Sequence, residues 1–453
     1  MIELDEYQKK AVYEIGNILL VAGAGAGKTL TITKKIEYLV NILKYKPEEI
    51  LIISFTNKSV DDLKRKIKYS CPIYTFHKLA MNILYDHKIN FNIVNDDYLE
   101  FVTNEFFKSL TNKNMIHEIL HFFKEFDYNR FLNTYKYKEF IRLIVKLIKI
   151  YKTNNCNINA FNNMWQNNNF VTKYFFIIKN IYEKELKSTN SMDFDDLIIN
   201  ATNVLNKFYR FKYIFVDEFQ DTSLIRFNLI NKLRIVNKAF IFAVGDDYQS
   251  IYHFSGCDIN LFLDFPKLIP NSKVLKLKYT YRNSQELIDI AAKFIMKNKK
   301  QLKKDLISNK RINSPIKIIY YINPKKSFSK LYKKLKIINN DVLVLGRNNS
   351  DIKFFVDKED EINFLTVHSS KGLEAENIIL INMTNNLYGF PNKIKNHSLL
   401  ELLHPSDKDI LFSEERRLFY VALTRTKNKI YILVPIFNKS CFIKELKKLI
   451  NKH

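Results

Sequence analysis

The sequence is short of cysteine. Only four cysteines occur among 453 residues, and no two of them form a CxxC pair. This scarcity excludes a disulfide framework and offers no pattern for a zinc knuckle. We expect ordinary thiols and globular cores, because 47% of the residues are hydrophobic. The cysteines are Cys71, Cys156, Cys257 and Cys441.

Long apolar runs are also missing. The first ten residues, MIELDEYQKK, lack the basic and then apolar pattern of a secretory signal. No uninterrupted apolar run reaches the length that crosses a bilayer. We therefore expect an intracellular protein with no membrane partner, and a chain of 453 residues suits two to four domains.

Arginine is scarce, although positive charge is not. The formal net charge is +25, but only 12 of the 72 basic residues are arginine. Such an excess attracts polyanions, nucleic acid first and anionic membranes second, although AT-rich coding could also inflate the lysine content. An arginine retained in such a chain indicates a need for the planar fork that lysine cannot supply.

Short apolar strands alternate with helical stretches over most of the chain. The first strand, residues 18–21, leads through a glycine-rich turn into a helix that begins at Lys28. This alternation predicts parallel sheets of a doubly wound α/β fold. Residues 85–191 break the rhythm, because they have helical periodicity and lack short strands. We expect them to form an inserted helical subdomain.

The turn after the first strand has the composition of a phosphate-binding loop. In such a loop the backbone N–H groups point at phosphates, Lys28 reaches the outer phosphates and Thr29 binds Mg²⁺. The general pattern GxxxxGK[ST] has glycine where this chain has Ala22, and the loop alone indicates only nucleotide binding. Its residues are Ala22, Gly23, Ala24, Gly25, Ala26, Gly27, Lys28 and Thr29.

An acidic motif, VDEFQD, directly follows the apolar stretch YIFV. In a parallel sheet this position lies at the carboxyl end, where nucleotides bind. Asp217 is suited to bind Mg²⁺ through its water shell, and Glu218 is suited to orient and deprotonate an attacking water. A solvated acidic loop is the plain alternative, but the accompanying phosphate-binding loop favours a catalytic role.

One further pattern is rejected. HEILH at residues 117–121 fits the HExxH zinc pattern, with both histidines on one face of a helix. It lies in the expected helical insertion beside two phenylalanines and has no convincing third ligand. We therefore predict no zinc site there.

Ten short motifs follow one another along the chain. They are LDEYQKKAV, AGAGAGKT, ISFTNKS, YTFHKLA, DFDDLI, VDEFQD, VGDDYQSIYHFSG, YRNS, TVHSSKGLE and EERRLFYVALTRTK. The same order is found in UvrD/Rep-type superfamily 1 DNA helicases, and the chain resembles that family over nearly its whole length. The resemblance implies an α/β fold of two RecA-like P-loop NTPase lobes with parallel sheets, and ATP and Mg²⁺ bound between the lobes.

The motif spacing sets the expected domain boundaries. The first lobe comprises residues 1–84 and 192–272, the helical insertion (1B in the family) residues 85–191, and the second lobe residues 273–453. In the family a second insertion, called 2B, separates the strand carrying GRN from TVHSSKGLE, whereas only residues 349–363 stand between them here. We expect a compact form without 2B and without an extension after the second lobe.

The resemblance also implies individual roles at the ATP site. Gln8 reads the adenine edge, Tyr281 stacks on the adenine ring and Glu374 holds the ribose. Gln249 senses the γ-phosphate, and Arg282 and Arg425 approach it from the second lobe as finger residues. The planar forks of arginine suit the charge that spreads over the γ-phosphate oxygens in the transition state. The implied catalytic residues are Lys28, Glu218, Gln249, Arg282 and Arg425.

The implied nucleic-acid track crosses both lobes. Its base-stacking platforms are Phe55, Tyr252 and Phe254, and stacking on aromatic rings tolerates any base sequence. Phe254 and Ser255 occupy positions where the family usually has tryptophan and arginine, so we expect a smaller stacking area and one phosphate contact fewer. The implied backbone contacts are Asn57, His77, His368 and Lys371.

The expected function is a 3′ to 5′ DNA helicase or translocase that acts on single-stranded DNA and duplex junctions. A monomeric motor is expected, with an accessory protein for processive unwinding. Three alternatives stay open: a single-strand translocase that strips proteins with little unwinding, an RNA helicase, and a scaffold that binds nucleic acid without hydrolysis. Stacking and phosphate contacts do not by themselves distinguish the sugars.

Overall fold

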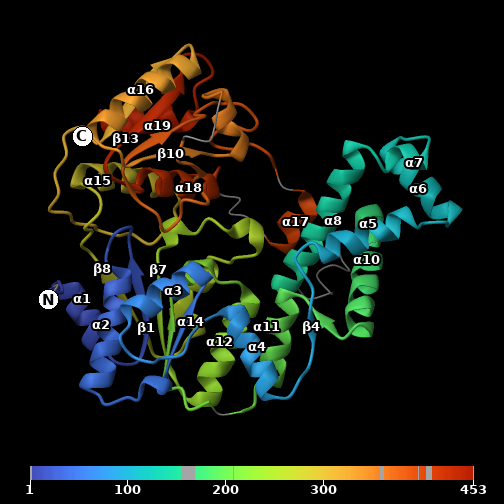
Figure 1. Ribbon diagram of the computed structural model, residues 1–453, viewed down its shortest axis with the longest axis horizontal. Helices are drawn as coiled ribbons and strands as arrows, with labels where there is room; N and C mark the ends of the chain where they lie inside the picture. Colours follow the sequence, from blue (N-terminus) through green and yellow to red (C-terminus); the bar gives the residue numbers. More distant parts are fainter. Residues whose placement is uncertain are drawn as a thin grey trace.

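The structure consists of two α/β lobes and a helical subdomain that projects to one side (Figure 1). It is a computed structural model. It describes residues 3–154, 169–207, 209–357, 362–395, 397–404 and 411–451, so Cys156 lies outside the described residues. Both lobes are built on parallel sheets, which confirms the expected fold class.

The first lobe contains a six-stranded parallel sheet with the order β3-β2-β6-β7-β1-β8. Its central strands are continuous apolar runs, because helices cover both faces of the sheet. The strands are β1 (Asn17–Ala22), β2 (Ile50–Ser54), β3 (Ile73–Thr75), β6 (Tyr213–Val216), β7 (Phe240–Gly245) and β8 (Ser272–Leu277).

Two separate cores lie on the two faces of this sheet. Ile18 and Leu20 of β1 belong to the core under α1, α2 and α3, whereas Leu19 and Val21 belong to the core under α4, α11 and α12. Successive side chains of a strand point to opposite faces, so one strand serves both cores. The helices are α1 (Glu6–Tyr13), α2 (Lys28–Asn41), α3 (Asn57–Lys66), α4 (Phe76–Asp86), α11 (Phe194–Val204), α12 (Leu224–Asn237), α13 (Asn260–Leu263) and α14 (Phe265–Leu268).

Short 3₁₀ turns stand at functionally important strand ends of the first lobe. One follows β6 and two follow β7, at the carboxyl edge of the sheet. They hold the side chains of the acidic motif and of the motif VGDDYQSIYHFSG close to the second lobe. These three turns are η2 (Phe219–Asp221), η3 (Asp247–Gln249) and η4 (His253–Ser255), whereas a further turn, η1 (Pro47–Glu49), precedes β2.

The second lobe contains a five-stranded parallel sheet with the order β11-β10-β12-β13-β9. Helices α15, α18 and α19 share a core with one face, and α16 and η5 share a core with the other. The strands are β9 (Ile316–Tyr321), β10 (Val342–Gly346), β11 (Phe364–Thr366), β12 (Ala375–Leu380) and β13 (Thr426–Pro435). The helices are α15 (Gln285–Ile295), α16 (Pro324–Ile338), η5 (Asn349–Phe354), α17 (Ser398–Leu403), α18 (Ser413–Leu423) and α19 (Cys441–Ile450).

The predicted start of the second lobe at residue 273 is wrong, because it assigns strand β8 to the second lobe. Strand β8 pairs in parallel with β1, from Asn17 opposite Ser272 to Ala22 opposite Leu277, and so completes the first sheet. Apart from Tyr248 and Ile251, which reach over from the segment after β7, the buried residues of the second-lobe core begin with α15. Motif spacing did not predict this, because the alternating pattern of an edge strand does not state which sheet it joins.

The helical subdomain has its own apolar core of leucine, isoleucine and aromatic side chains. A two-residue parallel pair, β4 (Asn92–Ile93) with β5 (Ser191–Met192), closes its base, so the predicted insertion does contain short strands. None of the described helices is long and apolar enough to span a membrane. The helices are α5 (Tyr98–Lys108), α6 (Lys113–Phe123), α7 (Tyr128–Phe131), α8 (Tyr135–Thr153) and α10 (Asn169–Ser188).

Helix α17 joins all three bodies. It belongs by sequence to the second lobe, between β12 and α18, but Figure 1 shows it against α8 of the helical subdomain. Its Leu399 and Leu400 are buried in the core of that subdomain. Just after it, the ring of His404 stacks on His253 of the first lobe at 3.8 Å, and its Nε2 lies 3.0 Å from the carbonyl oxygen of Cys257. The helical subdomain is therefore tied to both lobes.

Candidate functional site

The phosphate-binding loop lies between β1 and α2. Gly25 and Gly27 have φ angles of +69° and +78°, and a Cβ on Gly27 would lie 2.6 Å from Nε2 of Gln8. No side chain caps α2, so the first backbone N–H groups of this helix have no side-chain acceptor, and such helix ends bind anions. Ala22 is the last residue of β1, fully buried and without a positive φ, so alanine fits where the general pattern has glycine.

Lys28 and Glu218 form an ion pair in this loop. The Nζ atom of Lys28 lies 2.7 Å from Oε1 of Glu218. Burial disfavours the charged lysine, but the carboxylates of Glu218 and Asp217 outweigh it and raise the pKa of Lys28. Burial likewise acts against the Glu218 carboxylate, but Lys28 and Lys371 outweigh it and lower the pKa of Glu218 to about 2. Glu218 is thus ionised at neutral pH, as a proton acceptor must be.

Asp217 and Thr29 supply oxygen atoms beside the loop. Asp217 is buried at the end of β6, where its Oδ1 accepts the backbone N–H of Glu218 at 3.0 Å. Burial and the neighbouring Glu218 raise the pKa of Asp217 to about 6. A hydroxyl and a carboxylate are the hard ligands that Mg²⁺ prefers, and it is usually bound through one or two such groups together with water and phosphates. These two residues fit that ion.

The described part of the chain contains no cluster of three or more His, Cys, Asp or Glu side chains that could hold a metal ion. At the rejected HExxH pattern, the rings of His117 and His121 lie 6.5 Å apart between their centroids. No third ligand of these types completes a site with them. A magnesium ion at Asp217 and Thr29 therefore needs oxygen atoms from the nucleotide and from water.

Gln8 and Tyr281 lie beside the loop. In a reciprocal capping box at the start of α1, the N–H of Gln8 donates to Asp5 at 2.8 Å, and Nε2 of Gln8 donates to the carbonyl of Ala26 at 3.3 Å. The hydroxyl of Tyr281 donates to Asp5 at 2.7 Å, and its backbone N–H donates to Gly25 at 3.0 Å. Tyr281 stays 60% exposed and offers a face for stacking, whereas Gln8 beside the loop is fully buried.

The second lobe contributes a buried arginine. Arg425 is 1% exposed, and its guanidinium donates to Oε1 of Gln249 at 3.0 Å. Nε2 of Gln249 donates in turn to Asp246 at 2.6 Å. Burial, reinforced by Arg282, lowers the pKa of Arg425 to about 9, so the group stays charged at neutral pH. Gln249 and Arg425 thus join the two lobes at the predicted γ-phosphate side.

Arg282 and Glu374 are also brought together. Nε of Arg282 donates to Oε2 of Glu374 at 2.7 Å, and Lys427 lies 3.1 Å from the other oxygen of Glu374. A Cβ on Gly25 would lie 2.5 Å from Cβ of Arg282, so glycine at this position lets the second-lobe segment approach the loop. The carboxylate of Glu374 already has two cationic partners, so a ribose hydroxyl would have to compete with them for its oxygen atoms.

Lys304 is a site residue that the sequence did not indicate. Its side chain is 3% exposed and pairs with both Asp246 and Asp247, with 2.6 Å to Oδ1 of Asp247. Its Nζ lies 3.7 Å from the ring centroid of Tyr248. Lys304 therefore anchors the aspartate that orients Gln249. It stands in the lysine-rich segment KNKKQLKKDL, where no pattern separates it from its neighbours.

The predicted stacking residues line two neighbouring cavities. A cavity of about 510 Å³ between the lobes has Phe55, Tyr252 and His368 in its wall. A second, of about 820 Å³, lies between the first lobe and the helical subdomain and has His77 and Phe254 in its wall. The ring centroids of Phe254 and His368 are 5.5 Å apart, so the aromatic walls of the two cavities are continuous. We call the two cavities together the strand channel.

The four predicted backbone contacts have different surroundings. Asn57 is exposed at the start of α3 and is absent from the wall of both cavities. Lys371 is 9% exposed, and its ammonium group donates to Asp221 and, at 2.7 Å, to the carbonyl of Gln249. Burial and Arg226 lower the pKa of His77 to about 4, so a neutral ring faces the channel.

The ammonium group of Lys371 is therefore already engaged by protein groups, and it connects the channel wall to the nucleotide side. His368 likewise has a pKa of about 4, lowered by burial and by Arg347, and is neutral. A neutral imidazole can still donate one N–H to a phosphate or a base. The sequence could not show these states, because they depend on burial and on neighbours far along the chain.

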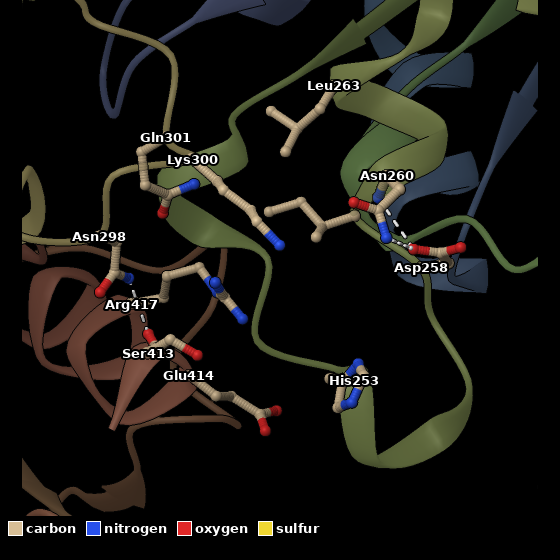
Figure 2. Close-up of a pocket in the computed structure, with 11 residues that line it drawn as sticks. His253, Asp258, Asn260, Leu263, Asn298, Lys300, Gln301, Ser413, Glu414 and Arg417 are labelled. Atoms are coloured by element: carbon tan, nitrogen blue, oxygen red, sulfur yellow. Dashed lines mark hydrogen bonds between the residues drawn. The ribbon is translucent and has the colours of Figure 1, made fainter. Parts of the chain in front are cut away.

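A third, polar cavity of about 190 Å³ separates the lobes near the channel (Figure 2). Nε of Arg417 in α18 donates across the interface to the carbonyl of Ser250 at 2.6 Å. Amide and charged side chains make the contact here, and such polar interfaces permit relative movement of domains. The labelled lining residues are His253, Asp258, Asn260, Leu263, Asn298, Lys300, Gln301, Ser413, Glu414 and Arg417.

Comparison with known proteins gives two family matches. Residues 4–270 match the family model described as the UvrD/REP helicase N-terminal domain. Residues 352–435 match the model described as the UvrD-like helicase C-terminal domain. The first match spans the helical subdomain and most of the first lobe, and the second match spans part of the second lobe.

Similar proteins carry helicase names. A protein named DNA helicase IV from Escherichia coli (strain K12) is 28% identical over 96% of this chain and 68% of its own length. A protein named ATP-dependent DNA helicase Rep from Buchnera aphidicola subsp. Baizongia pistaciae is 31% identical over 78% of this chain. The chain spans about half, 52%, of that Rep protein. A protein named probable DNA helicase from Mycoplasma pneumoniae is 29% identical over the whole chain and 88% of its own length.

Replacing Lys304 with methionine tests its anchoring role. The change leaves Asp246 and Asp247 buried without their cation, and breaking such a pair costs about 3–5 kcal/mol. We expect a lower urea midpoint and a fall in ATP turnover of about tenfold to a hundredfold, because Gln249 loses its fixed orientation. Lys303→Met is the matched control, since that side chain is exposed and pairs only with exposed Asp305. Equal behaviour of both variants would contradict the anchoring role.

Proposed function

The chain belongs to the UvrD/REP helicase family, and from this we propose that it is an ATP-driven motor that moves along single-stranded DNA and separates duplexes. The observation that carries the proposal is the double use of Gln249. Its side chain accepts from Arg425 of the second lobe, and its backbone carbonyl accepts from Lys371 in the wall of the strand channel. One residue thus contacts both the hydrolysis side and the track side.

We assign the steps of hydrolysis to residues of the two lobes. Lys28 and the backbone of the loop bind the β- and γ-phosphates of ATP. Glu218 orients the attacking water and accepts its proton, and Arg282 and Arg425 offset the charge that develops on the γ-phosphoryl oxygens. A magnesium ion held by Asp217 and Thr29 would neutralise phosphate charge when bound. Gln8, Tyr281 and Glu374 would hold the nucleoside.

Movement follows from how the site is divided between the lobes. Closure of the lobes on ATP brings both finger arginines to the phosphates, and release of product lets the lobes part again. The ammonium group of Lys371 lies 5.1 Å from the ring centroid of Tyr252, so a shift of Gln249 is passed to a stacking residue. Alternating grip on bases by Phe55, Tyr252 and Phe254 then gives net translation along the strand.

We propose single-stranded DNA and duplex junctions as the partners, and movement from 3′ to 5′. DNA is favoured over RNA because the similar proteins carry DNA helicase names. We further propose a monomeric motor, since both lobes and the helical subdomain are encoded in one chain, and an accessory protein for long duplexes. We also propose that the protein acts inside the cell, because its proposed track is DNA.

A second candidate function is a single-strand translocase with little unwinding. One observation favours it: only residues 347–363 connect β10 to β11, which is too short for a domain of the usual size. The motor would then have no 2B domain to hold the duplex. A non-hydrolysing scaffold is disfavoured, because Lys28, Glu218, Gln249, Arg282 and Arg425 are all present and together.

Replacing Glu218 with glutamine tests the hydrolytic assignment. The amide keeps the shape but cannot accept the proton, and loss of a general base costs roughly 10²–10⁴-fold in rate. We expect DNA-stimulated turnover to fall by that factor while ATP still binds, whereas Lys28→Ala should weaken ATP binding itself. Glu37→Gln, on α2 and paired with Lys34, is a surface control that should keep wild-type turnover. Undiminished turnover in Glu218→Gln would contradict the assignment.

Tailed duplexes test direction and unwinding together. We expect displacement of a short strand from a duplex with a 3′ single-stranded tail, little from one with a 5′ tail, and a yield that declines as the duplex lengthens. The Glu218→Gln variant supplies the blank for spontaneous melting. Preference for the 5′ tail would refute the direction. Translocation without displacement at any length would support the second candidate function.

A further inference from the structure

Arg226 lies where the two cavities of the strand channel meet. It stands in the first turn of α12 and lines both the cavity between the lobes and the cavity beneath the helical subdomain. Its guanidinium carbon is 5.0 Å from the ring centroid of Phe55 and 5.8 Å from that of Phe76. The cation therefore stacks against the predicted base platform Phe55 from the side of the protein.

The guanidinium group of Arg226 is incompletely satisfied by the protein. Its Nε is buried and has no hydrogen-bond partner, and an unmade hydrogen bond of a buried charged group is costly. No ion pair within 4.0 Å involves Arg226 in the described ranges. A cation that the fold holds at a cavity wall with no carboxylate within 4.0 Å among the described residues is suited to an anionic ligand.

The surroundings restrict where that anion can lie. Asp96, Glu100 and Asp195 line the cavity beneath the helical subdomain, and Asp62 and Asp221 line the cavity between the lobes. These carboxylates repel phosphates. A nucleic-acid backbone that passes through both cavities must therefore be held by local cations, and Arg226 is the cation at the passage between them.

The choice of arginine supports a specific contact. Lysine supplies 60 of the 72 basic residues, so retention of arginine at this position indicates a need for its fork. Ser255 lines the same two cavities and occupies the position where the UvrD/Rep family usually has arginine. Arg226 thus provides a guanidinium group to the same space from another element.

We propose that Arg226 binds a backbone phosphate of single-stranded DNA at the junction of the two cavities. Its planar fork donates to the phosphate oxygens, while its stacked face holds Phe55 in position for a base. This inference rests on the proposed function, because it assigns a phosphate site within the proposed track. Arg226 stands five residues after Asp221, the partner of Lys371, so the site is close along the chain to the link with the nucleotide side.

Salt-dependent binding of a short oligothymidylate tests the proposal. For Arg226→Gln we expect the Kd to rise about tenfold or more, since hydrogen bonds to charged groups are the strong ones. The slope of log K against log salt should become shallower by about 0.7, the value of one phosphate on a single strand. Arg226→Lys should keep the slope but bind more weakly than wild type, because it keeps the charge and loses the fork.

Arg234→Gln is the matched control. It lies in the last turn of the same helix, and its Nε donates to Asn231 away from both cavities. We expect wild-type affinity and slope for it, and thermal unfolding checks that each variant is folded. If Arg226→Gln does not fold, Arg226→Lys carries the test through its affinity.

Two results would overturn the inference while leaving the proposed function intact. One is a wild-type salt slope in folded Arg226→Gln, and the other is wild-type affinity in Arg226→Lys. Failure of the wild-type protein itself to bind the oligothymidylate would instead refute the proposed function, and the phosphate site with it.

Discussion

The hydrogen bond between Arg425 and Gln249 is the interaction on which the rest of the site depends. It crosses the lobe interface at 3.0 Å and is almost fully buried. From Gln249 the network continues through Asp246 to Lys304, and through the Gln249 carbonyl to Lys371 and Asp221. Buried charges of this kind cost desolvation, so their value lies less in stability than in a fixed arrangement. A movement of either lobe must change several partners together.

The helical subdomain takes part in this arrangement through α17. Its leucines are embedded in the core beside α8, while the following His404 contacts the first lobe beside the stacking segment. A displacement of the second lobe therefore moves the helical subdomain as well as the first-lobe residues that line the strand channel. The polar cavity in Figure 2 lies at the same interface, where amide and charged groups exchange partners more easily than a close-packed apolar core would.

Several residues that the sequence predicted for the nucleotide side lie close together in the folded chain. Gln8, Gly27 and Tyr281 are far apart in the chain, yet they meet, because strands β1 and β8 end side by side. The placement of β8 itself was wrong, since an edge-strand pattern does not identify its sheet. Lys304 carried no signal, because it is hidden among lysines. Arg226 carried only the general signal of a retained arginine, because it lies between motifs. Their roles depend on burial and on neighbours that only the folded chain brings together.

We expect the nucleotide site and the strand channel to be energetically coupled through this network. The most direct test of this coupling is to measure the Kd of oligothymidylate with and without a non-hydrolysable ATP analogue and Mg²⁺, and the Kd of the analogue with and without oligothymidylate. Coupled sites must change each other's affinity by the same factor, which for such systems is about 5–150. We predict one such factor, equal in both directions. A factor of one in both measurements would contradict the account.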